Sequence, residues 1–188
     1  MKQKERTLNK SNIDSIINEF TNSIEGLGAS ISGKTGISLL EALKREKLTT
    51  GPYPGVTLFE AANRIMTDLV ILHGVSWLLK NNIFPFDSYT VEFGNEDHNG
   101  FDITAKMGNK SLVGEAFNVA PSFFQGKKSA MVKKLRNDGT SSTFKIIMVN
   151  ADAVTYGYCP KTEKGLYYVI VDIETSSARI IPKPYIQA

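Results

Sequence analysis

Alternating apolar and polar residues flank Gly108-Asn109, and this hairpin signal within residues 101–119 is the strongest constraint on the fold. Glycine and asparagine tolerate the positive φ angles that a two-residue turn requires. A turn at this pair predicts two antiparallel strands whose register places Asp102 directly opposite Glu115. Opposed side chains on neighbouring strands have Cβ atoms about 5 Å apart. We therefore expect the two carboxylates to lie side by side.

Two carboxylates in such a position repel each other unless positive charge lies between them. Strand alternation places Glu115 on one face with Val113, Phe117 and Val119, where an unpaired charge is costly. A divalent cation, which binds oxygen ligands of this kind, is the obvious candidate. The pair predicts a metal site, although Glu115 at a strand end could also simply reach water.

The chain has 188 residues, of which 41% are hydrophobic and 22% charged. These values are typical of one globular domain with room for a core. The single cysteine, Cys159, excludes an internal disulfide, disfavours a structural zinc site and indicates a reducing cytoplasm. The start of the chain is polar, and no apolar run is long enough to cross a membrane, so neither a signal peptide nor membrane contact is expected.

The remaining patterns alternate between helical and extended periodicity. Apolar spacing predicts helices over residues 13–27, 37–43 and 58–79, and from 121 to 135 or 136. Further strands are expected over residues 89–93, 144–149 and 166–173, and the tail as a last short strand or an extended arm.

Two of these helices begin at the same signal. Thr57 and Glu60 form a capping box, and Ser122 and Gln125 are spaced as a second one. The helix after Thr57 is too apolar for a surface helix and is expected to lie against the sheet. The predicted fold is α/β, with a mixed central sheet of about five strands flanked by helices. One domain is expected, with a helical part (1–56), a core (57–150) and C-terminal strands (151–188).

A basic segment follows the hairpin. Residues 116–137 contain no acid, although the net charge of the whole chain is only +3. Such a local positive field suits the binding of phosphate groups. A solvated helix face would show the same composition. The cations concerned are Lys127, Lys128, Lys133, Lys134 and Arg136.

From Thr57 to Asn150 the chain resembles the PD-(D/E)XK nuclease superfamily, and type II restriction endonucleases within it. The resemblance rests on the order helix, three-stranded meander, crossover helix and fourth strand, an αβββαβ core that here has extra N-terminal helices. In that family an acid on the second strand and another on the third hold Mg²⁺, and Asp102 and Glu115 match them. The stretch 115–124 resembles the branch that cuts GATC-type sites.

The resemblance also implies further metal ligands, and this chain departs from the family pattern at one position. An acid of the preceding helix often assists, and Glu60 is the nearest match, with Glu92 on the first strand as the other candidate. The family's lysine should lie two residues after the second acid, where this chain has Phe117, which can neither ligate a metal nor polarise water. Candidates to supply the cation from elsewhere are Lys106, Lys127 and Lys128.

The implied function is a Mg²⁺-dependent DNA endonuclease, most simply a type II restriction enzyme. It would act on double-stranded DNA as a homodimer, with one site for each strand of a palindrome. Asp102 and Glu115 would hold the cation, and Lys127 or Lys128 would stabilise charge at the scissile phosphate. Neighbouring phosphates would contact the cations of the basic segment: Lys127, Lys128, Lys133, Lys134 and Arg136.

Two other functions remain open at this point. Phe117 favours a non-catalytic DNA-binding or regulatory protein on the same fold. Residues 28–35 match the P-loop pattern G-x4-G-K-T, which would indicate nucleotide binding at Lys34. That motif requires a buried strand before it, whereas the preceding residues have helical spacing.

Overall fold

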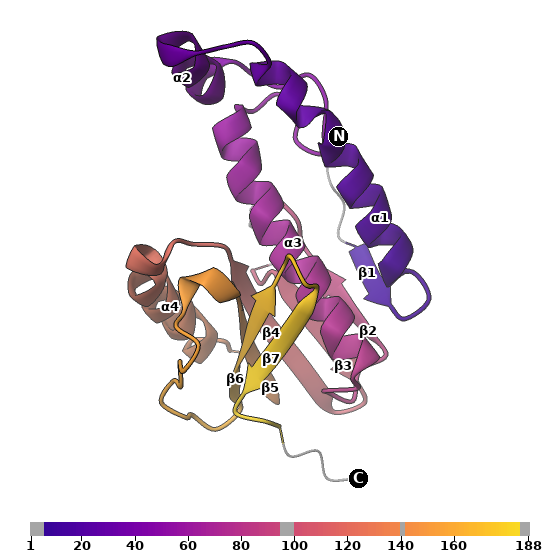
Figure 1. The fold of residues 1–188 in the computed structure, drawn as a ribbon. Helices are drawn as coiled ribbons and strands as arrows, with labels where there is room; N and C mark the ends of the chain where they lie inside the picture. The colour runs from indigo at the N-terminus through magenta and orange to yellow at the C-terminus, as the bar shows by residue number, and fades with distance from the viewer. Residues whose placement is uncertain (1–5, 95–99, 140–141, 185–188) are drawn as a thin grey trace.

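The structure is a computed structural model, which describes residues 6–94, 100–139 and 142–184 and has a mixed α/β fold around one sheet (Figure 1). Seven strands lie in the sheet in the order in which they occur in the chain. They are β1 (Arg6–Asn9), β2 (Ser88–Val91), β3 (Ile103–Met107), β4 (Lys110–Phe117), β5 (Phe144–Asn150), β6 (Leu166–Asp172) and β7 (Ser177–Ile181).

Helices flank the sheet. The α-helices are α1 (Ile13–Ile24), α2 (Gly36–Arg45), α3 (Leu58–Lys80) and α4 (Pro121–Arg136). Short 3-10 segments are η1 (Glu25–Ile31) and η2 (Ala151–Ala153). In Figure 1, α3 crosses one face of the sheet and α4 covers the other, while α1 and α2 lie beside α3. No helix in these described ranges is long and apolar enough to cross a membrane.

The sheet changes character along its width. Strands β1 to β4 pair antiparallel, β4 to β6 pair parallel, and β7 returns antiparallel to β6. The parallel pairing of β4 and β5 requires a crossover connection, and α4 supplies it. The hairpin, its turn and the crossover helix are therefore continuous in the chain.

The mixed sheet was predicted with about five strands, and this number is wrong, because the described part of the chain contributes seven strands to it. The tail forms β7 rather than an extended arm, and β1 was not predicted at all. β1 has four residues, of which only Leu8 is buried, so it is too short to produce a recognisable alternation. Its pairing with β2 at the edge of the sheet is a tertiary effect.

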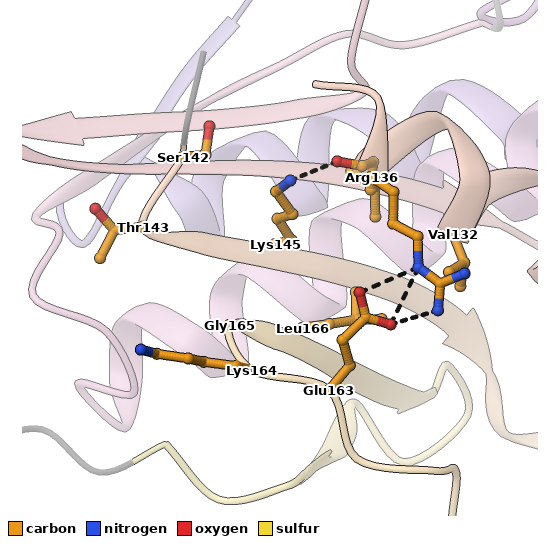
Figure 2. A pocket seen from close by; sticks show the side chains of 10 residues that line it. Val132, Arg136, Ser142, Thr143, Lys145, Glu163, Lys164, Gly165 and Leu166 are labelled. Carbon is orange, nitrogen blue, oxygen red and sulfur yellow. Dashed lines mark hydrogen bonds and ion pairs between the residues drawn. The ribbon is translucent and has the colours of Figure 1, made fainter. Parts of the chain in front are cut away.

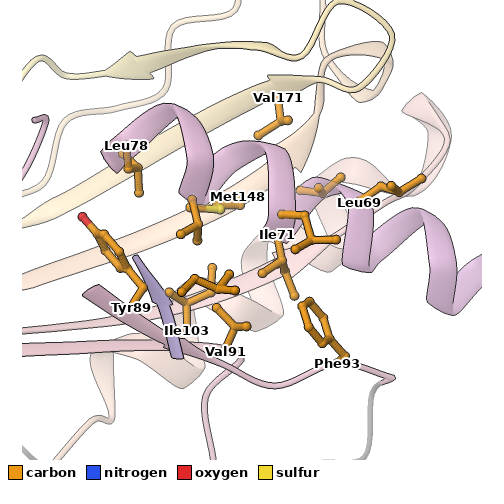
Figure 3. Close-up of a cluster of buried hydrophobic side chains, with 14 of the residues drawn as sticks. Leu69, Ile71, Leu78, Tyr89, Val91, Phe93, Ile103, Met148 and Val171 are labelled. Atoms are coloured by element: carbon orange, nitrogen blue, oxygen red, sulfur yellow. The ribbon is translucent and has the colours of Figure 1, made fainter. Parts of the chain in front are cut away.

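The α3 face of the sheet holds the larger hydrophobic core, which Figure 3 shows. Ile71 and Leu72 of α3 are almost completely buried against Ile103, Ile146 and other sheet residues. From Thr67 to Leu79 nearly all of α3 is buried, which explains why its sequence is apolar on all sides. The expectation that this helix lies against the sheet is confirmed.

The α4 face holds a second, smaller core. Val113 and Phe117 of β4 point into it, whereas Leu112 and Ala116 belong to the core under α3. This confirms the predicted alternation along β4. Phe117 is 2% exposed and packs against Phe124 of α4, with 6.4 Å between ring centroids.

The two predicted capping boxes have different outcomes. At α3 the Thr57 side chain accepts a hydrogen bond from the Glu60 amide at 3.2 Å, as predicted. At α4 the N-cap is Ala120, which makes no side-chain capping bond, so the box of Ser122 and Gln125 is wrong. Pro121 occupies the start of the helix, where its fixed φ angle favours initiation without a cap.

Candidate active site

The hairpin register agrees with the prediction. Met107 pairs with Lys110 across the turn, and Gly108 has the positive φ of 59° that the turn requires. At the other end of this pairing Ile103 lies opposite Gly114, so one further step places Asp102 beside Glu115. A carboxylate oxygen of Asp102 accepts a hydrogen bond from the Ala116 amide at 2.7 Å, which holds it against β4.

Glu92 extends this row of acids to a third strand. Its amide donates to the Asp102 carbonyl oxygen at 2.9 Å, so the two residues lie opposite each other where β2 and β3 adjoin. Glu92 is buried, and strand alternation places it on the α4 face because Val91 belongs to the core under α3. Glu92 directly after β2, Asp102 directly before β3 and Glu115 of β4 thus lie in line across the sheet.

Glu115 is 3% exposed and forms an ion pair with Lys134 of α4, with 2.8 Å between Oε1 and Nζ. A buried carboxylate costs a large desolvation free energy, which a directly bound cation offsets. The sequence-based expectation assigned Lys134 only to DNA phosphates. Here its ammonium group lies directly beside the second acid.

A cleft of about 580 Å³ opens over these groups. Asp102 and Glu115 form part of its floor, and α4 forms one wall with Lys127, Met131 and Lys134. These three residues follow helical spacing, so they share one face of α4. The cleft is therefore acidic at its base and basic along one side.

The connection between β4 and α4 is held by Asn150 at the end of β5. Its side-chain oxygen accepts from the Val119 amide at 2.9 Å, and its amide nitrogen donates to the Val119 carbonyl at 3.1 Å. This buried clamp determines where the chain leaves the sheet and turns into α4. It thereby positions Lys127 and Lys134 over the acids.

The other predicted cations lie apart from the cleft. Lys128 donates to Gln125 at 2.6 Å, and its ammonium lies 5.5 Å from the Phe124 ring centroid. Lys133 is exposed on α4 and does not line the cleft. Lys106, near the tip of the hairpin, is also exposed and outside the cleft.

Arg136 makes a two-pronged ion pair with Glu163, which Figure 2 shows. Its Nε lies 3.1 Å from both carboxylate oxygens, and these bonds raise the pKa of the guanidinium and lower that of the Glu163 carboxyl. Nearby, Lys145 donates to the Leu135 carbonyl at 2.6 Å and caps the end of α4. Arg136 therefore already has an acidic partner on the protein.

Glu60 lies outside the site. Its carboxylate pairs with Arg64 one turn along α3, at 2.7 Å, and it does not line the cleft. The acid of α3 nearest to the hairpin is instead Asp68, which sequence reasoning missed. Asp68 accepts hydrogen bonds from the Tyr53 hydroxyl and, at 3.1 Å, from the Gly94 amide.

Burial raises the pKa of the Asp68 carboxyl from 3.8 to about 7, and the negative charge of Asp102 acts in the same direction. The hydrogen bonds from Tyr53 and Gly94 oppose this rise. Because Gly94 lies two residues after Glu92, its bond to Asp68 holds the backbone near the acids in place. The sequence did indicate that Asp68 is unusual, because it is a charged residue at the centre of an otherwise apolar helix.

The donor set fits a hard divalent cation. Mg²⁺ keeps several waters and needs only one or two protein carboxylates, which Asp102 and Glu115 provide from adjacent strands beside an open cleft. Within the described ranges no group of three or more His, Cys, Asp or Glu residues is arranged to enclose a metal.

The P-loop alternative lacks its structural context. Residues 28–35 lie in η1 and the turn after it, preceded by α1 rather than by a buried strand. The Lys34 ammonium is paired with Glu46. Because the motif needs amides that converge at the junction of strand and helix, this segment does not form a phosphate cradle.

Comparison of the chain with models of protein families, with curated proteins and with solved structures finds no significant match to any of them.

Proposed function

We propose that the cleft between the hairpin and α4 is the active site of a metal-dependent phosphodiesterase that acts on DNA. The observation that carries the proposal is the meeting of two adjacent carboxylates, Asp102 and Glu115, with two lysines of α4 in one open cleft. Paired acids suit a divalent cation, and lysines suit the phosphate that such a cation would bind. Neither feature alone would favour this chemistry.

Asp102 and Glu115 are the residues that would hold Mg²⁺. A bound divalent ion supplies a water of lowered pKa and offsets negative charge on the phosphate. The Ala116 amide orients the Asp102 carboxylate through the 2.7 Å hydrogen bond. Glu92, the next acid in the row, is buried and does not line the cleft, so the proposal assigns the ligand role to Asp102 and Glu115 alone.

Lys134 is proposed as the cation that stabilises the scissile phosphate. Its ammonium, 2.8 Å from Glu115, can donate at the same time to a phosphate oxygen in the cleft. Lys127, on the same face of α4, would hold that phosphate or a neighbouring one. A lysine delivered by the crossover helix replaces the one that Phe117 cannot supply, because Phe117 belongs to the apolar core beneath α4.

The order α3, β2 to β4, α4 and β5 supports a restriction-endonuclease-like core, with Asp102 and Glu115 at its metal-binding positions. Within that proposal the substrate is double-stranded DNA, and a homodimer would bring one site to each strand. The proposed reaction adds water across one P–O bond and leaves a phosphate on one end and a hydroxyl on the other.

A second candidate function is DNA binding without cleavage. The ion pair of Glu115 with Lys134 favours it, since this pair satisfies the buried acid without a metal. The two functions differ in one result, which is whether DNA is cut when Mg²⁺ or Mn²⁺ is present.

The test is incubation of the protein with plasmid and phage DNA in Mg²⁺ or Mn²⁺, alongside two variants. Glu115→Ala should lower cleavage at least about a hundredfold and leave DNA binding largely intact, because it removes a metal ligand and not a phosphate contact. Glu163→Ala is the matched control, since it also removes an acid paired with a cation of α4 but lies outside the cleft.

Discrete fragments from the wild-type protein would indicate a restriction enzyme, and smearing would indicate a nuclease without site preference. A gel shift with no cutting in either metal would reject hydrolysis and leave the binding function. Undiminished cleavage by Glu115→Ala would remove this cleft from the mechanism.

A further inference from the structure

Phe123 is an exposed phenyl ring beside the proposed site. It lies in the first turn of α4 and is 71% exposed. Its neighbour Phe124 is buried and contacts the rings of Phe117 and Tyr158. Within the part of the chain that the structure describes, no ring or cation contact is found for Phe123. The packing of α4 therefore does not explain why an aromatic residue occupies this exposed position.

The position of Phe123 relates it to the cleft. Lys127 is four residues further along α4, so the two side chains are neighbours on one face, about 6 Å apart along the helix axis. Lys134 is eleven residues from Phe123, which is close to three complete turns and returns to the same side of the helix. The ring thus extends the wall of α4 that carries Lys127 and Lys134.

The charge around the ring is positive. Residues 116–137 contain no acid, and the nearest cation on the same face is Lys127. A flat apolar ring next to ammonium groups is the combination that binds single-stranded nucleic acids, in which bases stack on aromatic side chains while cations follow the phosphates. A duplex offers no exposed base face, so the ring suits a base that has left its pair.

Another exposed phenyl ring has a different environment. Phe59 lies in the first turn of α3, and the Lys44 ammonium covers it at 3.5 Å from the ring centroid. Exposed apolar residues are common on protein surfaces and need no functional reason. Phe123 differs from Phe59 in that it is uncovered and continues a row of cleft residues.

We infer that Phe123 is a stacking platform for an unpaired nucleobase next to the proposed scissile phosphate. The inference rests on the proposed function and defines its substrate more closely. The base can come from a single strand or from a duplex in which one base is displaced. Both sources present the same flat π face to the ring, with the phosphate of that nucleotide at Lys127.

The test measures binding without cleavage, by fluorescence anisotropy of labelled DNA in EDTA. Three DNAs are compared, namely a single strand, its perfect duplex and the same duplex with one mismatch. Phe123→Ala should weaken binding about fivefold to a hundredfold, the range measured when one stacked base loses its aromatic partner. Phe123→Trp should restore the wild-type affinity, whereas Phe123→Leu, which is apolar but not flat, should not.

Phe59→Ala is the matched control and should bind as the wild type does. A loss confined to the single strand would identify that source, and a loss greatest for the mismatched duplex would identify a displaced base. Equal affinity of Phe123→Ala and wild type for all three DNAs would overturn the inference, as would restoration by Phe123→Leu.

These results are separate from the test of the nuclease. Binding that depends on Phe123, in a protein that cuts no DNA with metal present, would support the platform and reject hydrolysis. Cleavage that depends on Glu115, together with binding that does not depend on Phe123, would support hydrolysis and reject the stacking platform.

Discussion

The two faces of the sheet each bury a carboxylate, and the surroundings of the two groups differ. On the α3 face, Asp68 accepts hydrogen bonds from neutral donors, and burial raises its pKa to about 7. On the α4 face, Glu115 pairs directly with the ammonium group of Lys134. In an open cleft, the ammonium group beside a carboxylate can be replaced by a metal ion or can bind a phosphate. The contacts of Asp68 instead connect α3 to two loops of the same chain.

The surrounding packing differs in the same way. α3 is buried on nearly all sides over its second half, while α4 buries only Phe124, Val132 and Leu135. A helix that packs on one side leaves its other side for ligands. The comparison teaches that one sheet can carry a closely packed helix on one face and an open cleft lined by charged groups on the other.

The largest expected effect is on the α4 face. Lys134→Ala should lower DNA cleavage at least about a hundredfold. The variant removes the cation that pairs with Glu115 and that is proposed to stabilise the scissile phosphate. Rates are measured under single-turnover conditions on a labelled oligonucleotide. Lys128→Ala is the control and should change the rate less than about threefold, because Lys128 bonds to Gln125 outside the cleft.

The opposite ranking of these two lysines would contradict the site as described. It would favour the sequence-based hypothesis that Lys127 or Lys128 supplies the catalytic cation, and a role for Lys128 would require α4 to rotate when DNA binds. Lys127→Ala should fall between the two variants, because its side chain lines the cleft without contacting Glu115.

A second effect is expected on the α3 face and depends on pH. The folded protein holds a proton on Asp68 more tightly than the unfolded chain does, so this group stabilises the fold fully below pH 3.8 and loses that contribution as the pH rises to about 7. Asp68→Asn removes the titration. Between pH 3.8 and about 7 the wild type loses this contribution and the variant does not. The free energy of unfolding of the variant minus that of the wild type should therefore rise by about 2 to 4 kcal/mol over this pH range.

Urea unfolding at several pH values measures this difference. Parallel curves for Asp68→Asn and wild type between pH 4 and 7 would show that Asp68 is ionised in the fold.

The smallest expected effect is on stability and compares one glycine of α3 with one glycine of α4. A Cβ at Gly74 of α3 would lie 2.6 Å from the Met148 sulfur and 3.2 Å from Val171, whereas a Cβ at Gly126 of α4 would meet nothing within 4 Å. Alanine gains about 1 kcal/mol of helix propensity at either position. Gly126→Ala should therefore stabilise the protein, and overpacking should make Gly74→Ala less stable than Gly126→Ala by about 1 to 3 kcal/mol.

Thermal or urea unfolding of the two variants gives this ranking. Equal stabilisation by both substitutions would mean that the α3 face has space that the described packing does not contain.

The hairpin could be predicted from the sequence because its determinants are local. Gly108 and Asn109 select the turn, and the turn then determines the register that brings Asp102 to Glu115. The same holds for the start of α3, where Thr57 caps the helix. At α4 the capping signal failed because Pro121 already determines where the helix begins.

The partner of Glu115 could not be predicted in this way. Lys134 reaches it only because Asn150 clamps Val119 and directs α4 back across the sheet, and these contacts join residues far apart in the chain. Asp68 was missed for the same reason, since its partners Tyr53 and Gly94 come from separate loops. Local patterns predict elements, whereas the polar contacts between elements depend on the packed fold.

Binding of Mn²⁺ to the protein tests the central claim most directly. Isothermal titration calorimetry should detect Mn²⁺ binding to the wild-type chain, and both Asp102→Asn and Glu115→Gln should weaken it at least about tenfold, since each removes a charged oxygen ligand. Glu163→Gln should bind as the wild type does. Equal Mn²⁺ affinity in all four proteins, or no binding by the wild type with or without DNA, would contradict a metal site at the paired carboxylates.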